Sequence, residues 1–155
     1  MSRNFGIVRT AEIALPITAG TMKTLAQLIS PGNWSVVVFE IAVGFDLTTA
    51  TNQSPNEFQL ARQTTAGTMT AFTPLKLDSR ISDTLQSSGQ VNATAEPTLG
   101  DLLDSNQIES HSSVVIQYPP LKGEIIMPGS TRVGLLVANG ATAAMNARSH
   151  IKFEE

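Results

Sequence analysis

The chain of 155 residues contains no cysteine, so disulfide bonds, thiol catalysis and cysteine-based metal sites are excluded. Charged residues make up only 15% of the chain, against the roughly 25% usual in globular proteins, and the net charge is −3. No basic run is present to neutralise phosphates, so we expect no binding to nucleic acid. Aromatic residues, at 5%, are too scarce for a platform on which bases would stack.

Long hydrophobic runs are also missing. No apolar segment approaches the ~20 residues that a membrane-spanning helix needs, and residues 1–6 lack the apolar region of a signal peptide. We therefore expect no membrane association, and a protein that is made in the cytoplasm and used there or assembled there into something larger. Ser, Thr, Asn and Gln replace the missing charges, and such a surface is readily desolvated when it contacts other proteins.

What the sequence does have is a series of short apolar segments separated by Pro and Gly. The strongest, residues 34–45 (WSVVVFEIAVGF), is rich in β-branched and aromatic side chains and follows the turn signal at residues 30–33. It predicts a central, buried strand with Phe39, Ile41 and Val43 on one face. Further extended segments are predicted at residues 57–63, 69–77, 114–118, 123–127, 132–137 and 147–153.

Four segments fit a sheet less well. Residues 23–29 fit either a strand or one helical turn. Residues 46–56 are polar and predict a loop, and residues 80–96 predict a surface excursion rather than core because large apolar side chains are scarce there. Residues 98–108 (TLGDLLDSNQI) are the only candidate helix, since residues suited to capping stand near its start.

The overall pattern is seven or eight short strands joined by turns and two long loops, without a sustained helical period. This predicts an all-β fold, a jelly-roll-like antiparallel β-sandwich with at most one short helix. Residues 1–22 form either an N-terminal arm or the first strand, and residues 23–155 form the β-sandwich (jelly-roll) domain. The sequence TAGTM occurs at residues 18–22 and 65–69, but its flanks differ and no third copy exists, so we predict no repeat architecture.

Residues that carry chemistry in other proteins are few and scattered here. His111 lies among serines, but no Gly-x-Ser-x-Gly elbow accompanies it, so we interpret it as a loop histidine before a strand. His150 lies in the predicted last strand, and we expect it to be exposed. Asp101, Asp104 and Glu109 lack the alternating acids and fixed glycine of a calcium loop, so capping and solvation explain them better. We expect no enzyme, no catalytic residue, no metal and no cofactor.

One glycine-rich segment, residues 129–134 (GSTRVG), lacks both the lysine-serine pair and the following helix of a phosphate-binding loop. It predicts instead a tight hairpin turn in which Gly129 is free to adopt a positive φ angle. The strand predicted at residues 132–137 would then follow the one at 123–127 at hairpin distance.

Several blocks of the sequence, in order, resemble the cement or decoration proteins of phage and prophage capsids. The blocks are residues 63–78 (QTTAGTMTAFTPLKLD), 94–101 (TAEPTLGD), 109–118, 124–137 (EIIMPGSTRVGLLV) and the ending 153–155. The similarity runs from about residue 23 to the end, whereas residues 1–21 and 139–145 depart from the pattern. The resemblance implies a jelly roll, usually trimeric, that is seated on the outside of an icosahedral head and clamps neighbouring capsid subunits, without catalytic residues.

The predicted function is therefore that of a structural virion protein on the exterior of a phage head, assembled in the host cytoplasm. Its expected partners are the major capsid protein and itself, as a homotrimer. The candidate capsid contacts are Arg3, Phe5, Ile7 and Arg9, because Arg and aromatic residues are favoured at protein interfaces.

The alternative is a receptor- or glycan-binding module of a fibre or tail tip, built on a similar sandwich. Such modules usually expose Trp and Tyr to sugar rings. This chain has one of each, Trp34, which we expect at the head of a core strand, and Tyr118, which precedes two prolines. A small hydrolase is a third class, but nothing in the sequence predicts the cluster of Ser, His and acid that it requires.

Overall fold

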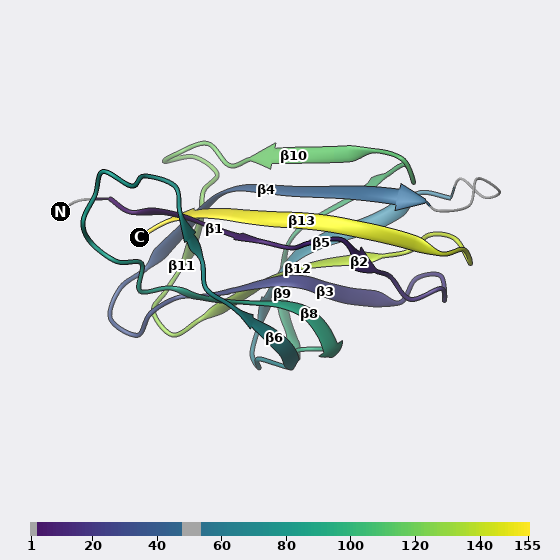
Figure 1. Cartoon of the computed structure of the whole chain (residues 1–155), viewed down its shortest axis with the longest axis horizontal. Coiled ribbons are helices and arrows are strands. Elements are labelled where there is room, and N and C mark those ends of the chain that lie inside the picture. The colour runs from purple at the N-terminus through teal and green to yellow at the C-terminus, as the bar shows by residue number, and fades with distance from the viewer. Residues whose placement is uncertain (1–2, 48–53) are drawn as a thin grey trace.

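The computed structural model describes residues 3–47 and 54–155, and within them every regular element is a β-strand (Figure 1). The first sheet has the order β10 (Ser113–Gln117), β4 (Val36–Leu47), β13 (Met145–Glu154), β1 (Phe5–Arg9) and β7 (Leu75–Lys76). Two short strands add to it, β11 (Ile125–Met127) beside β4 and β2 (Ile13–Ala14) beside β13. The second sheet has the order β6 (Thr68–Phe72), β8 (Ser88–Ala95), β3 (Met22–Ile29), β12 (Arg132–Ala138), β5 (Asn56–Gln63) and β9 (Leu99–Ile108). The predicted all-β antiparallel sandwich is confirmed.

The strand pairing is nested, as in a jelly roll. Strand β1 pairs with β13, β3 with β12, β4 with β10 and β5 with β9, so the chain folds as one long hairpin wrapped around the core. The pairs β13–β4 and β12–β5 then join the halves of each sheet. Strands β6, β7 and β8 are inserted between the innermost pair, and they extend both sheets at the edges next to β1 and β3.

The core lies between the sheets and follows the alternation of the strands. In β13, Ile151 and Phe153 are fully buried while Lys152 and Glu154 face outward, as predicted. In β12, Val133, Leu135 and Val137 face the same core, and Leu136 faces the other way.

Strand β4 departs from its predicted face because it contains a bulge. Lys152 pairs with Glu40 and Phe153 with Val38, so Phe39 is an extra residue without a partner opposite it. Phe39 is therefore half-buried on the outer side, not in line with Ile41 as predicted. The prediction that Trp34 heads the core strand is also wrong, because β4 begins at Val36 and Trp34 is 46% exposed.

The predicted helix at residues 98–108 is wrong, because this segment is the edge strand β9. Its side chains are mostly exposed, so no apolar stripe is buried that would stabilise a helix. Its backbone instead pairs with β5, through two register shifts. Tertiary pairing thus overrides the local preference.

The prediction for residues 80–96 is wrong in its second half, where strand β8 lies against β3. The small residues that made this segment look like a loop are what the packing requires. A Cβ atom on Gly89 would come within 2.8 Å of the Val8 side chain, so only glycine fits there without a shift. Residues 23–29, by contrast, follow the strand alternative, as β3.

The turn at residues 128–131 also differs from prediction, because it links β11 of the first sheet to β12 of the second and does not form a hairpin. Ser130, with φ of 62°, takes the left-handed conformation predicted for Gly129. Gly129 is instead required by close approach, since a Cβ there would be 2.7 Å from the carbonyl oxygen of Gly32. Of the predicted loop 46–56, residues 48–53 lie outside the described residues.

Candidate functional site

The outer side of the first sheet, which we call the open face, carries the predicted contact residues. Phe5, Ile7 and Arg9 face outward from β1, because Gly6 and Val8 between them are buried toward the core. Arg3, just before the strand, is exposed and its Nε lies 2.9 Å from Glu154 Oε1. The segment is part of the sheet, since β1 is hydrogen-bonded to β13 on one side and to β7 on the other.

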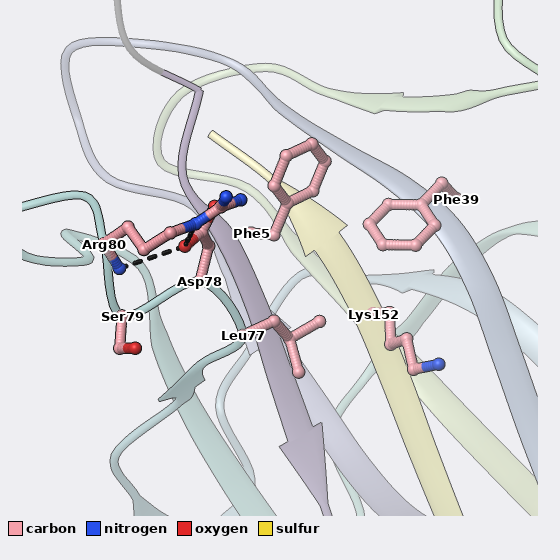
Figure 2. Close-up of a pocket in the computed structure, with 7 residues that line it drawn as sticks. All are labelled: Phe5, Phe39, Leu77, Asp78, Ser79, Arg80 and Lys152. Atoms are coloured by element: carbon pink, nitrogen blue, oxygen red, sulfur yellow. Dashed lines mark hydrogen bonds and ion pairs between the residues drawn. The ribbon is translucent and has the colours of Figure 1, made fainter.

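Two aromatic side chains meet on the open face, as Figure 2 shows. The rings of Phe5 and Phe39 pack edge to face, with centroids 5.9 Å apart, and Leu77 lies beside them. Together with Lys152 and the segment 78–80 they line a shallow hollow of about 610 Å³. At its rim Arg80 donates to Asp78, and this hydrogen bond lowers the pKa of the Asp78 carboxyl to about 2.

A group of charged side chains that the sequence did not predict lies near the middle of the same face. Glu40 of β4 is only 9% exposed in its side chain, and its carboxylate lies 2.6 Å from Lys152 Nζ and 3.0 Å from His150 Nε2. Gln117 of β10 donates to the other carboxylate oxygen at 3.0 Å. Hydrogen bonds from Lys152 first, and then from Gln117 and His150, lower the pKa of Glu40 to about 2 despite its burial.

Sequence reasoning missed Glu40 and expected His150 to be exposed. The structure shows His150 half-buried against Glu40, because the register of β13 on β4 aligns Lys152 with Glu40 and His150 with Ala42. A signal was present in the sequence. An acid lies in the middle of the most apolar strand, and basic residues alternate on the outward side of the last strand, at positions 148, 150 and 152.

Apolar side chains surround this charged group without being covered by the chain. On β7 and after it, Leu75 and Leu77 are 44% and 48% exposed, and on the far side of the sheet Val115 and Ile126 are 57% and 50% exposed. The strand registers place Leu75 beside Ile7 and Val115 beside Ala42, all on the outer side. An apolar surface with its charges already paired is suited to binding another protein, because few unsatisfied charges must lose water.

The outer side of the second sheet, which we call the closed face, is covered by the chain itself. Residues 64–67 connect β5 to β6, which lie four positions apart in the sheet, and residues 96–98 connect β8 to β9 in the same way. A flat sheet would require the first link to cross about 19 Å, whereas its five backbone steps reach at most about 17 Å, so the sheet must curl. The two links are hydrogen-bonded to each other, Thr64 N to Thr98 O at 2.9 Å.

Beneath these links lies a network of buried amides and hydroxyls. Gln27 donates to Gln63 at 2.6 Å, Gln63 donates to Thr24 Oγ1 at 3.0 Å, and Thr24 Oγ1 donates to Glu96 at 2.6 Å. Leu136 is buried on the same side. The part of the closed face around these residues therefore behaves as a second, polar core, whereas Leu102 of the edge strand β9 stays 55% exposed.

The remaining candidate residues do not come together. His111 is exposed in the loop before β10, and the neighbouring Ser110 is buried and donates to the carbonyl of Ser54 at 2.9 Å. Asp104 accepts a hydrogen bond from Tyr118 at 2.8 Å, and burial first, then this hydrogen bond, raises the pKa of the Tyr118 hydroxyl. Within residues 3–47 and 54–155 no three acidic or histidine side chains gather in a way that could hold a metal. No helix in this described part of the chain is long and apolar enough to cross a membrane.

The sequence matches no protein-family model, and no curated protein is significantly similar to it. The resemblance to capsid decoration proteins therefore stays a prediction.

Proposed function

We propose that this protein is a structural virion protein, which binds the outside of a phage head as a homotrimer and joins neighbouring major capsid subunits. The observation that carries the proposal is the open face, where exposed apolar side chains surround a charged group that is already paired. On this proposal the protein acts by binding alone, changes no covalent bond and uses no cofactor.

The open face has the composition of a protein interface. Its aromatic and aliphatic side chains, Phe5, Phe39 and Leu77 among them, supply the apolar area that such interfaces bury at their centre. The Glu40 carboxylate keeps its partners Lys152 and His150 when a partner covers the face, so contact does not leave a charge unpaired. Strands β1, β4 and β13 of the first sheet also hold Phe5, Phe39 and the Glu40 group in fixed positions, which lowers the conformational entropy lost on binding.

A trimer would bind the shell more tightly than a single copy does. Three copies that engage the shell together raise the apparent affinity by roughly 10²–10⁴ over that of one copy, provided that the spacing allows simultaneous contact. A closed threefold arrangement also matches what a symmetric shell presents at its local symmetry axes. Weak individual faces on a small domain are then sufficient for stable attachment.

The experiment uses capsids of the phage that encodes the chain, prepared without the protein. We expect the added wild-type protein to sediment with these capsids and to raise the temperature at which they open. The Leu75→Ser/Leu77→Ser variant should remain a folded trimer by light scattering but bind at least tenfold more weakly, about 1.4 kcal/mol.

The matched control is Leu102→Ser, because Leu102 is 55% exposed on the edge strand β9 of the other sheet. This variant should bind as tightly as the wild type. Capsids that open at the same temperature with and without the protein would refute the proposal. If both sets of substitutions weaken binding equally, the open face is not the surface that binds the capsid.

A further inference from the structure

A second depression, of about 910 Å³, lies at the end of the sandwich where β1 begins and β13 ends (Figure 1). Its walls come from residues 3–4 just before β1, from residues 34–35 before β4, from the segment 82–86 and from residues 154–155 at the end of β13. The volume falls within the roughly 300–1,000 Å³ of sites that hold small molecules. The open face and its proposed function do not use this depression, apart from the paired Arg3 and Glu154 at its edge.

The depression exposes the only tryptophan of the chain. Trp34 is 46% exposed, although the indole is among the side chains that gain most from burial. The residue lies in the link between β3 and β4, so it is held at the wall by the ends of both sheets. A flat indole beside polar side chains is suited to the face of a sugar ring, whose C–H groups pack on the aromatic surface while its hydroxyls reach the polar groups.

One polar group at this wall lacks a partner. Asn4 is 7% exposed, and its backbone is fixed by two hydrogen bonds with Glu155, of 3.0 and 2.9 Å. Its Oδ1 is buried and has no hydrogen-bond partner among the residues that the structure describes. An unpaired buried acceptor costs about 1–3 kcal/mol. Asn4 lines the depression, so a turn of its side chain would bring the amide to a ligand hydroxyl, which both donates and accepts.

The charges at the depression decide what kind of ligand fits. Three acids, Asp83, Glu154 and Glu155, line it against one arginine, Arg3, which is paired with Glu154. The Glu155 carboxylate also accepts hydrogen bonds from the backbone N–H groups of residues 86 and 87. This excess of negative charge disfavours ligands with phosphate, sulfate or carboxylate groups and favours uncharged ligands that carry hydroxyl groups.

We propose that the depression binds a neutral saccharide, with one pyranose ring packed on Trp34 and a hydroxyl hydrogen-bonded to the Asn4 amide. The hydroxyl and amide side chains of Thr84 and Gln86 lie at the same wall and can meet further sugar hydroxyls. Each site is shallow and weak. If the protein is displayed in many copies on a particle, as the proposed function has it, the particle would adhere to polysaccharide through many such contacts.

The test is a titration of the isolated protein with three neutral oligosaccharides, maltotriose, cellotriose and N,N′,N″-triacetylchitotriose, and with anionic sialyllactose. Because Trp34 is the only tryptophan, its fluorescence reports on this site alone. We expect a saturable change in emission with at least one neutral sugar at about 10 mM, enough to saturate a site with a Kd of about 1 mM. Sialyllactose should give a change at least tenfold weaker.

Variants are compared by NMR chemical-shift titration, since Trp34→Ala removes the fluorophore. Trp34→Ala should abolish the shifts, Trp34→Phe should retain part of the affinity, and Asn4→Ala should weaken binding about tenfold. Tyr118→Phe, at a residue that does not line the depression, should bind as the wild type does. No saturable binding of any neutral sugar, or binding that Trp34→Ala leaves unchanged, would overturn the inference. Neither result affects the capsid-binding test, which uses no saccharide.

Discussion

The two outer faces of this sandwich contrast in how their polar groups are arranged. On the closed face, Gln27, Gln63 and Thr24 form a buried network that two short links cover. On the open face, Glu40, His150 and Lys152 form a group of paired charges, but no segment of the described chain covers the apolar side chains around it. Both sheets come from the same nested hairpin, so topology alone does not explain the difference.

The difference shows which face the chain covers with its own segments. The links that close the second sheet are too short to leave it flat, so that sheet must curl and bury its outer side. On the first sheet the inserted strand β7 adds only two residues at the edge, Leu75 and Lys76, and Leu75 stays 44% exposed. Substitutions should therefore affect folding on the closed face and binding on the open one.

The largest effect is expected from Gly134→Ala on the closed face. A Cβ atom there would lie 2.3 Å from the Gln63 side chain, so Gln63 must move and its hydrogen bonds to Gln27 and Thr24 must break. We expect a loss of about 3–5 kcal/mol in the free energy of unfolding, because steric strain adds to unsatisfied amides. Urea denaturation followed by circular dichroism measures it.

The matched control is Gly100→Ala on β9 of the same sheet. An added Cβ there meets its nearest atom at 3.4 Å, which is ordinary contact, so the denaturation midpoint should change little. Equal midpoints for the wild type and Gly134→Ala would show that the closed face is not a packed polar core.

The two faces also differ in how much of their structure could be predicted from the sequence. Alternation identified β13 and its buried Ile151 and Phe153, because each of these side chains individually obeys the two-residue period. The same alternation failed at Phe39, because a bulge depends on the register of the neighbouring strand. It also failed at β8, where a glycine stands at position 89 because the Val8 side chain leaves no room for a Cβ atom. The sequence showed that Phe5 is an aromatic residue, a type favoured at interfaces. The partners of Glu40 could not be predicted, because they depend on which strand lies beside β4.

An intermediate effect is expected from Glu40→Gln, through the dependence of stability on pH. The pKa of Glu40 is about 2 in the folded protein against an ordinary value of 4.5, so the folded state binds fewer protons between these values. The stabilisation is fully present above pH 4.5 and is lost as the pH falls toward 2. It amounts to at most about 3 kcal/mol.

Thermal unfolding at pH 7 and at pH 2 separates the variant from the wild type. The wild type should be more stable at pH 7, and the two should converge at low pH. The matched control is Glu12→Gln, since Glu12 is an exposed acid whose pKa is lowered by Arg148 and Asn146. It should change the pH dependence far less, because water and salt screen an exposed pair. A constant difference at both pH values would rule out an ionised, stabilising Glu40.

The smallest effect on folding is expected on the open face, from Leu77→Ala. Leu77 is 48% exposed, and its side chain already contacts water, so the free energy of unfolding should fall by less than about 1 kcal/mol. The comparison is with Leu136→Ala on the closed face, where the same atoms are removed from a side chain that is 1% exposed, at a cost of about 2–5 kcal/mol. Urea midpoints of the two variants measure the difference. If the two substitutions cost the same, Leu77 is covered in solution, and light scattering would then show whether a second copy of the chain covers it. If only Leu136→Ala is costly, the apolar surface around Glu40 contributes little to folding, and its exposure leaves it free for a partner.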